Sequence, residues 1–347
     1  MNLVATAKGY PSETHPQRGA FDHVLFRELR RLGVDVTVVT PENLISRSIL
    51  SIGSKLAPVD ETHEGVTIHR PRYFSYSNKT LPFGQSTYRW TVSSFSRTVL
   101  RHAESLKVRP DLCYGQFLYP GGVAAQRLAH EFGVPAVVLL GEGSFDHYER
   151  HFGLKRVRAT LAEFDGAIAV SETIKRLSTN RYRMLEDRVK VFPNAAASHF
   201  YPRPRDEMRR KLGLPLDRPI VGFVGHFDDN KGSQRVLEAI RIRPEIGAFF
   251  LGSGALAPTG PQVLYAGLAA HEQVPEWLSA ADLYVQPVRI EASSNAMKEA
   301  MACGLPIVSS DLATNREFLD ESMATLIDPG NVEKIRTAIF TLIDDPR

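Results

Sequence analysis

The stretch Leu283-Tyr-Val-Gln-Pro287-Val-Arg-Ile-Glu291-Ala-Ser-Ser-Asn295-Ala-Met-Lys-Glu299-Ala-Met-Ala-Cys-Gly304-Leu-Pro306-Ile-Val-Ser-Ser-Asp311 decides how this chain folds. It predicts a strand over 283–286, a loop, a helix over 295–302 and a second strand over 307–310, because apolar β-rich runs flank a segment of helical pattern. Ser293 or Ser294 can cap the helix, and Gly304 ends it. Strand, helix and strand in this order predict a parallel α/β sheet.

The start of the predicted helix has the chemistry of a diphosphate site. Its first backbone amides, near Ser293, Ser294 and Asn295, are unpaired donors at the positive end of the helix dipole. Glu299 lies about one turn further on, where its carboxylate could accept both hydroxyls of a ribose. Glu291 lies at the helix mouth, where a sugar on the diphosphate would lie. A solvated helix start is the other interpretation of these glutamates, since carboxylates favour first turns.

Short apolar runs alternate with helical patterns along the whole chain, which is typical of parallel sheets. Strands are expected in the first half at 3–6, 34–40, 66–69, 111–114, 136–140, 167–170 and 189–192, and in the second half at 220–224, 248–251, 263–266, 283–286, 307–310 and 325–327. The pattern fails in the proline-containing run 192–205. We therefore predict two Rossmann-like, doubly wound parallel-sheet domains, 1–200 and 201–347, facing a central cleft.

The first predicted helix lies between the first two strands. Apolar residues recur there at helical spacing and are expected to face the core. This stripe consists of Phe21, Val24, Leu25, Leu29 and Leu32.

A second loop of interest, Phe223-Val-Gly225-His226-Phe-Asp-Asp-Asn-Lys231-Gly232, follows the first strand of the second domain. Glycine at 225 lets backbone approach a phosphate, and Lys231 supplies a mobile positive charge. Gly252, in Gly252-Ser-Gly254 after the next strand, could approach the nucleotide similarly. Ordinary turns are the alternative interpretation of both segments.

Glu291 and Glu299, with the tail EAMACGLPIVSSD, closely resemble the donor-binding signature of retaining family-4 glycosyltransferases (glycosyl transferases group 1). The segments PDLCYGQFLYPGGVAA, DGAIAVSETIKRL, VKVFPN and PIVGFVG follow in the family's order, so the resemblance covers most of the chain. It implies the GT-B fold, with an acceptor-binding N-terminal domain and a C-terminal domain that binds a nucleotide sugar. No metal and no other cofactor are expected.

The resemblance also implies roles in the donor domain. His226 stands where the family usually has an arginine, five residues before the lysine, and would give the diphosphate a weaker, pH-dependent charge. The backbone at Leu268 matches the loop that contacts the base. Glu291, Lys231 and, in the first domain, Glu142 are our catalytic candidates.

The N-terminal candidates lie in loops that follow strands. Gly19 matches one of two family glycines that approach the donor phosphate, and Arg18 beside it is a candidate for a cation or an acceptor contact. Glu142 stands where the family often has a histidine beside the reacting sugar; an acceptor-orienting base and a hydrogen-bonded loop residue are equally good interpretations. Ser144 and His147 complete the acceptor side.

Composition excludes several classes of protein. With 347 residues, 43% hydrophobic and 23% charged, the chain is neither disordered nor collagen-like. Its apolar runs are far shorter than the ~18–20 residues of a membrane span. Cys113 and Cys303 lie far apart, without the spacing of a disulfide framework or a zinc site. We expect a cytoplasmic protein without a metal.

Charge divides the chain. Residues 1–200 hold 26 Lys and Arg against 19 Asp and Glu, whereas residues 201–347 hold 16 against 20. Within 70–109, eight basic residues and one acidic residue alternate with aromatic residues. This composition fits an anionic membrane surface, and hence a peripheral protein at the inner face of the membrane. Nucleic acid would need the same charge, but we favour the membrane because lipid-linked acceptors are common in the resembling family. A solvated helix face over core aromatics is the alternative.

We therefore expect a retaining hexosyltransferase (EC 2.4) that moves a sugar from a nucleotide diphosphate to a hydroxyl in cell-surface polysaccharide or glycolipid assembly. A UDP-sugar is favoured over a GDP-sugar. A nucleotide-sugar epimerase or hydrolase of the same two-domain plan is the alternative, followed by a non-catalytic nucleotide-sugar-binding protein. The family's final helix, which crosses back to the first domain, is expected to be missing.

Overall fold

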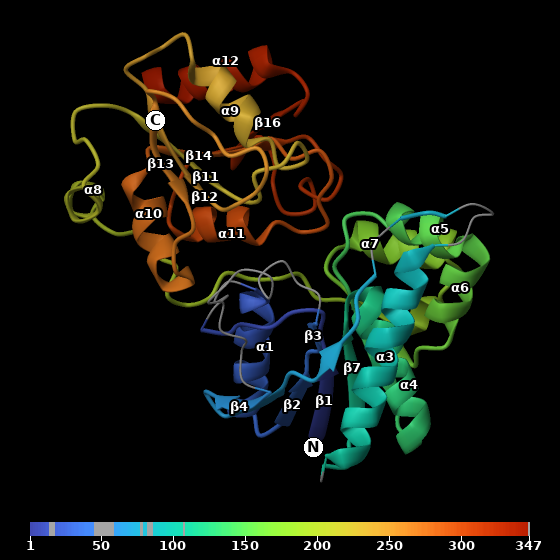
Figure 1. The fold of residues 1–347 in the computed structure, drawn as a ribbon. Coiled ribbons are helices and arrows are strands. Elements are labelled where there is room, and N and C mark those ends of the chain that lie inside the picture. The colour runs from blue at the N-terminus through green and yellow to red at the C-terminus, as the bar shows by residue number, and fades with distance from the viewer. Residues whose placement is uncertain (14–17, 45–58, 77–78, 82–85, 107, 346–347) are drawn as a thin grey trace. The chain divides into compact units, whose positions relative to one another are not determined.

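The computed structural model describes residues 1–13, 18–44, 59–76, 79–81, 86–106 and 108–345. Within these residues the chain forms two compact units, Met1–Pro193 and Asn194–Arg347. The division lies inside the run 192–205, where the sequence pattern fails. Each unit is an α/β sheet with helices on its faces (Figure 1).

The N-terminal unit is built on an eight-stranded sheet of order β10-β9-β8-β7-β1-β2-β5-β4. All neighbours are parallel except β4 and β5. Because β1 lies between β2 and β7, the direction of winding reverses beside it. The strands of this unit are β1 (Asn2–Thr6), β2 (Asp35–Val39), β3 (Glu42–Asn43), β4 (Asp60–His63), β5 (Val66–His69), β6 (Arg72–Tyr73), β7 (Leu112–Gln116), β8 (Ala136–Leu140), β9 (Gly166–Ala169) and β10 (Val189–Val191).

The helices of this unit connect successive strands, as in other doubly wound sheets. They are α1 (Ala20–Arg31), α3 (Thr87–Ser105), α4 (Val123–Phe132), α5 (Asp146–Phe152), α6 (Leu154–Ala162) and α7 (Glu172–Arg176). Short helical turns lie at Phe117–Gly122, Leu177–Arg181 and Glu186–Arg188. The strands β3 and β6 form a separate two-stranded sheet.

The predicted core face of α1 is wrong. Phe21, Leu25 and Leu32 of the expected stripe are exposed, whereas Asp22, His23 and Phe26 are buried. Phe26 packs on the rings of Tyr10 and Tyr114, so aromatic partners outside the helix select the buried face. The apolar periodicity of the helix contains no information about those partners, so it could not predict the buried face.

The C-terminal unit has a six-stranded, all-parallel sheet of order β13-β12-β11-β14-β15-β16. This is the strand order of the dinucleotide-binding Rossmann fold, and its winding reverses between β11 and β14. The strands are β11 (Ile220–Val224), β12 (Gly247–Leu251), β13 (Val263–Gly267), β14 (Leu283–Gln286), β15 (Ile307–Ser310) and β16 (Ala324–Ile327).

Helices cover both faces of this second sheet (Figure 1). Side chains of α9 and α12 form one apolar core with the strands, and those of α8, α10 and α11 form the other. The double burial explains why the strands have continuous apolar runs. The helices are α8 (Arg205–Leu212), α9 (Ser233–Ile240), α10 (Val274–Ala280), α11 (Asn295–Ala302) and α12 (Val332–Asp344), with a short turn at His271–Gln273.

The predicted fold class, two Rossmann-like parallel sheets, is confirmed. All of the expected strands form, five of them with the expected bounds, and β3, β4 and β6 are additional. These three strands are short, and the residues of β4, Asp-Glu-Thr-His, lack the apolar run that marks a buried strand. No helix among the described residues is long and apolar enough to cross a membrane.

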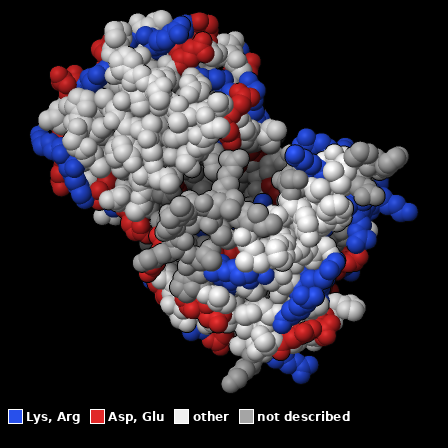
Figure 2. Space-filling view, viewed as in Figure 1, with Lys and Arg blue, Asp and Glu red and all other residues white. Residues whose placement is uncertain are grey.

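The basic and aromatic segment 70–109 divides between core and surface. Arg70 is 1% exposed and pairs with Glu61, and Tyr73, Tyr88 and Phe95 are core residues. Phe74, Tyr76 and Trp90 are exposed, as are Arg89, Arg97 and Arg101 of α3. The name α3 patch is used below for six exposed residues: Phe74, Tyr76, Arg89, Trp90, Arg97 and Arg101. Basic side chains run along the visible side of the N-terminal unit that holds α3 and α6 (Figure 2). Lys107 lies outside the described residues.

Candidate functional site

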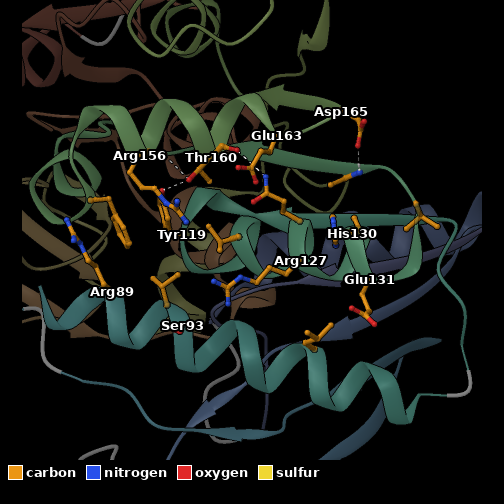
Figure 3. Close-up of a pocket in the computed structure, with 18 residues that line it drawn as sticks. Arg89, Ser93, Tyr119, Arg127, His130, Glu131, Arg156, Thr160, Glu163 and Asp165 are labelled. Atoms are coloured by element: carbon orange, nitrogen blue, oxygen red, sulfur yellow. Dashed lines mark hydrogen bonds between the residues drawn. The ribbon is translucent and has the colours of Figure 1, made fainter.

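A cavity of about 980 Å³ lies in the N-terminal unit among α3, α4 and α6. Arg89, Arg127 and Arg156 come from these three helices in turn and reach the same cavity (Figure 3). Burial, and then the charges of Arg97 and Arg156, lower the pKa of Arg127. None of the predicted site residues lines this cavity, and no sequence motif marked it.

Except for Gly19, which lies in the N-terminal unit, the predicted donor residues belong to the C-terminal unit, and Lys231 and Glu291 lie where the winding of its sheet reverses. β11 and β14 are neighbours there, and the loops that follow them contain Lys231 and Glu291. Ligands of such sheets bind beyond the carboxyl ends of the strands at this reversal. The side-chain amide of Gln286, at the end of β14, donates to the carbonyl of Val224, at the end of β11. This hydrogen bond joins the ends of β11 and β14, where the two loops begin.

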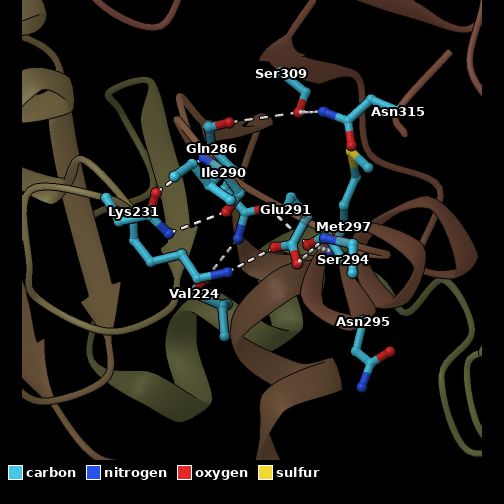
Figure 4. Close-up of polar contacts among 12 residues, drawn as sticks. Val224, Lys231, Gln286, Ile290, Glu291, Ser294, Asn295, Met297, Ser309 and Asn315 are labelled. Atoms are coloured by element: carbon cyan, nitrogen blue, oxygen red, sulfur yellow. Dashed lines mark hydrogen bonds and ion pairs between the residues drawn. The ribbon is translucent and has the colours of Figure 1, made fainter. Parts of the chain in front are cut away.

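Lys231 and Glu291 meet directly. Lys231 Nζ lies 2.6 Å from Glu291 Oε2, and the other oxygen of Glu291 accepts the Ala292 backbone N–H at 3.0 Å (Figure 4). The side chains are only 23% and 13% exposed. The side-chain amide of Asn230 bonds both backbone groups of Ile290, at 2.9 and 3.1 Å, so side-chain-to-backbone contacts also join the two loops. The result is a largely buried ion pair beyond the carboxyl ends of the central strands β11 and β14.

The start of α11 is capped by the second of the two candidate serines. Ser294 accepts the Met297 N–H at 3.3 Å and donates to Gln286 Oε1 at 2.6 Å. Ser293 accepts instead from Lys298 Nζ. The side-chain oxygen of Asn295 accepts a hydrogen bond from the side-chain amide of Asn194 at 2.8 Å. This helix therefore begins at Asn295, as expected, with its N-terminus beside the Lys231–Glu291 pair (Figure 4).

Glu299 has a partner that the sequence did not indicate. Its Oε1 lies 3.1 Å from Nε2 of His271, and both side chains are largely buried. The hydrogen bond that His271 donates to Glu299 raises the pKa of His271, although burial of the imidazole opposes this effect. His271 lies in the loop after β13, near the predicted base-binding Leu268. No spacing rule connects a histidine with a glutamate 28 residues further on.

Glycine is required where the loops after β11 and β12 cross. A Cβ on Gly252 would lie 1.9 Å from the carbonyl oxygen of Gly225. With a larger residue at position 252, the two loops could not approach one another this closely. His226, next to Gly225, is exposed, and its Nδ1 lies 3.1 Å from the Ser253 carbonyl oxygen. Leu268 is also exposed, and its carbonyl accepts from Tyr265 Oη at 2.7 Å.

Glu142 follows β8 in the N-terminal unit and has a buried carboxyl group. Its Oε1 accepts the Leu118 N–H at 2.6 Å and the Tyr148 hydroxyl at 3.0 Å, whereas Oε2 is buried with no hydrogen-bond partner within the described ranges. Burial raises the pKa of Glu142 to about 7, against the opposing effect of these hydrogen bonds. Phe117, which precedes Leu118, has a φ of 60°, a strained conformation for a bulky residue. Because its pKa is near 7, the carboxyl group of Glu142 can exchange a proton near neutral pH.

Gly19 and Arg18 lie where α1 begins. Gly19 is the N-terminal cap residue, with φ 71°, and a Cβ there would lie 2.6 Å from the Gly9 carbonyl oxygen. Arg18 donates to the Lys8 carbonyl at 2.8 Å. A close backbone approach therefore explains the glycine. Burial, followed by the charge of Arg18, lowers the pKa of Lys8.

Ser144 and His147 lie at the start of α5. Ser144 Oγ accepts the Asp146 N–H at 3.0 Å. The ring of His147 lies 4.4 Å from that of His151 and 5.1 Å from that of Tyr88. Burial, followed by the nearby charges of His151 and Arg150, lowers the pKa of His147. Ser144 lies in the same loop as Glu142, and His147 lies on α5, the helix that follows this loop.

The comparisons with known proteins agree with this arrangement. Residues 23–195 match the family described as "Glycosyl transferase 4-like domain", and residues 218–345 match "Glycosyl transferases group 1". The chain belongs to the group 1, or family-4, glycosyltransferases. It is therefore a transferase of class EC 2.4.

Relatives with assigned activities extend over most of the chain. A Bacillus subtilis glycosyltransferase named for teichuronic acid biosynthesis is 27% identical, over 98% of this chain and 88% of its own. A D-inositol 3-phosphate glycosyltransferase of Thermobispora bispora is 26% identical, over 92% and 80%. A GDP-mannose-dependent alpha-mannosyltransferase of Mycolicibacterium smegmatis is 25% identical, over 84% and 75%.

Solved structures show the same fold. A sucrose-phosphate synthase from Thermosynechococcus elongatus has a TM-score of 0.78 at 20% identity, covering 99% of this chain and 90% of that one. Anabaena HepE, solved in complex with UDP-glucose, has a TM-score of 0.72 at 17% identity, covering 100% and 90%. WaaG, a glycosyltransferase involved in lipopolysaccharide biosynthesis, has a TM-score of 0.69 at 14% identity, covering 100% and 91%. The fold is that of the GT-B glycosyltransferases.

Proposed function

We propose that this protein is a retaining glycosyltransferase whose C-terminal unit binds a nucleotide-diphosphate sugar at the reversal of its sheet. The observation that supports this most directly is the Lys231–Glu291 pair beside the N-terminus of α11, with Glu299 one turn along the helix. In this proposal the first amides of α11 and Lys231 hold the diphosphate, Glu299 accepts the ribose hydroxyls, and Glu291 orients the donor sugar.

The transfer step needs positive charge at the leaving group. The bond between the anomeric carbon and the phosphate oxygen breaks, and a bond to the acceptor oxygen forms on the same face of the sugar. The leaving phosphate oxygen takes the acceptor's proton, so a protein nucleophile is not needed. Lys231, the amides of α11 and the exposed His226 stabilise the negative charge that develops on the diphosphate. We propose that these groups supply the charge without a metal.

Glu142 is the proposed acceptor-side group of the N-terminal unit. Its pKa near 7 lets it accept or donate a proton at working pH, and its second oxygen has no hydrogen-bond partner among the described residues. We propose that Glu142 binds and orients the acceptor hydroxyl. Arg18, Ser144 and His147 remain acceptor-side candidates of this unit, and Gly19 remains a candidate for contact with the donor phosphate.

We place a UDP-sugar first among donors, with a GDP-sugar second. HepE, which shares the fold, was solved with UDP-glucose, whereas two mycobacterial relatives are named as dependent on GDP-mannose. The acceptor is proposed to belong to cell-surface polysaccharide or glycolipid assembly, because relatives are named for teichuronic acid and lipopolysaccharide core biosynthesis. The α3 patch, with exposed arginines and aromatics, supports docking on an anionic membrane surface.

A thermal-shift panel of UDP-, GDP- and ADP-sugars tests the donor. We expect one nucleotide to raise the melting temperature, with Lys231→Ala abolishing the shift. A chromatographic assay with that donor, with and without cell-envelope acceptors, tests the reaction. Turnover that requires an acceptor supports a transferase. Turnover without one would indicate an epimerase or hydrolase, and binding without turnover would indicate a non-catalytic protein; either result overturns the proposal.

A further inference from the structure

A group of two histidines and an aspartate lies at the sheet edge of the N-terminal unit, away from the residues assigned to sugar transfer. Asp60 begins β4 and His69 ends β5, and the two are directly paired in the antiparallel register. His102 lies on the last turn of α3. Three elements far apart in the sequence thus present nitrogen and carboxylate ligands to one point.

The donor atoms of this group are close enough to share one ion. Asp60 Oδ1 lies 2.6 Å from His69 Nδ1 and 4.0 Å from His102 Nε2, and all three atoms lie within 4.8 Å of one another. The rings of the two histidines are 4.9 Å apart. His102 Nε2 is buried and has no hydrogen-bond partner in the part of the chain that the structure describes. Since buried polar atoms are normally satisfied, this nitrogen lacks a partner that a metal ion would provide.

We propose that Asp60, His69 and His102 form a Zn²⁺ site. Zinc binds imidazole nitrogen and carboxylate oxygen at about 2.0–2.2 Å. In a tetrahedral site, bonds of this length place neighbouring ligand atoms roughly 3.3 Å apart. The observed separations of 2.6 and 4.0 Å lie on either side of that distance, so small side-chain rotations would bring the three atoms into position. The Asp60 side chain is 63% exposed, which leaves the fourth position open to water.

A neighbouring group provides a contrast. Three further ligand atoms, from His23, His63 and Glu64, also lie within 4.8 Å of one another. His63 and Glu64 lie at the turn between β4 and β5, and His23 lies on α1. There, however, both ring nitrogens of His23 are engaged, one by the Tyr10 hydroxyl at 2.7 Å and the other by Glu64 at 3.0 Å. Arg27 also donates to Glu64 at 3.3 Å, and its positive charge would repel a cation. We therefore assign the ion to the Asp60 group.

The ion would have a structural role. β4 is the edge strand of the sheet, and its residues are mostly exposed. Coordination would tie this strand and the end of β5 to the last turn of α3. The expectation of no metal rested on the absence of cysteine or histidine spacing typical of a zinc site and on the family resemblance. Here the ligands are 9 and 33 residues apart, so no short spacing marks them. None of the three residues belongs to the proposed diphosphate site.

The test uses the untagged full-length chain after treatment with EDTA. Zn²⁺ is titrated in competition with a colorimetric chelator, and Co²⁺ is used as a spectroscopic probe of coordination. We expect one equivalent to bind, with a visible Co²⁺ absorption band typical of a four-coordinate site. His69→Ala, His102→Ala and Asp60→Asn should each weaken binding at least tenfold and abolish the rise in melting temperature with zinc. His63→Ala is the matched control and should bind like the parent chain.

Several results would overturn the site. These are no binding at equimolar zinc, unchanged affinity in His102→Ala, or loss of binding in His63→Ala, which would move the ion to the other group. If an alanine variant does not fold by circular dichroism, Asp60→Asn decides, because it keeps the side-chain shape and removes only the charge. Parent-like zinc affinity in folded Asp60→Asn contradicts the proposal.

Discussion

Lys231 Nζ and Glu291 Oε2, 60 residues apart in sequence, lie 2.6 Å from one another at the reversal point of the C-terminal sheet. The pair joins the loop after β11 to the loop before α11. A diphosphate bound at the start of α11 would compete with Glu291 for the ammonium group. The two residues should therefore affect binding and transfer differently.

Changing Lys231 to alanine should weaken nucleotide-diphosphate binding about 10–100-fold, because a charge-assisted hydrogen bond contributes ~1.5–3 kcal/mol. Glu291→Gln should leave binding of the free nucleotide diphosphate unchanged or tighter, while lowering transfer from the nucleotide sugar at least tenfold. Isothermal titration calorimetry and single-turnover assays measure the two effects. Full transfer activity in Glu291→Gln would contradict its assigned role.

Glu299→Gln should change both the donor affinity and the titration of His271. The hydrogen bond that His271 donates to Glu299 raises the pKa of His271, so the pair stabilises the fold at pH values below the ordinary histidine pKa. That stabilisation is lost as the pH rises through the raised value. NMR titration should show a lower His271 pKa in Glu299→Gln, and the stability difference from the parent chain should shrink between pH 5.5 and pH 9. Glu299→Ala should in addition weaken nucleotide binding; unchanged affinity would remove the ribose assignment.

Glu142→Gln should make the protein more stable than the parent at alkaline pH. Burial raises the pKa of Glu142 from its ordinary 4.5 to about 7, so ionisation is disfavoured in the folded state. The parent chain therefore loses stability between about pH 4.5 and pH 7, by up to roughly 3 kcal/mol at ~1.4 kcal/mol per pKa unit. Urea denaturation of both proteins at pH 5 and pH 8 measures this. A stability difference that does not vary with pH would show that the carboxyl is not shifted.

Gly252→Ala should destabilise the C-terminal unit by about 2–4 kcal/mol, because the new Cβ would lie 1.9 Å from the Gly225 carbonyl oxygen. Gly330→Ala is the matched control, since its Cβ would come no nearer than 3.4 Å to Asp328. The control should change stability by less than about 1 kcal/mol. Thermal and urea unfolding compare the two variants, and equal effects would mean that the loop crossing tolerates a side chain.

Reversing two charges of the α3 patch, in Arg97→Glu with Arg101→Glu, should remove most binding to anionic vesicles. Each basic residue near such a surface contributes about 1 kcal/mol, so a loss of at least tenfold is expected in flotation of the full chain. Arg241→Glu, an exposed change in the other unit, is the control. Equal recovery of parent and variant, or equal binding to neutral vesicles, would count against membrane docking.

The helix and strands around the candidate donor site could be predicted well because their signals are local. The helix 295–302, its serine cap and the five strands with matching bounds depend on periodicity and capping over a few residues. The partners of those residues were not predicted. The sequence indicated Glu299 but not its partner His271. It indicated Glu142, but not that Oε2 of this carboxyl group is buried with no hydrogen-bond partner among the described residues.

The sequence by itself determined the order of strands and helices, the parallel sheets and the loops that carry the candidate donor residues. Only the tertiary structure decided which face of α1 is buried, which serine caps α11, and which charges meet. The physical reason is that propensity, capping and apolar period act between neighbours along the chain. Ion pairs and buried faces depend instead on which strands are adjacent: β11 beside β14 brings Lys231 to Glu291, and β4 beside β5 brings Asp60 to His69.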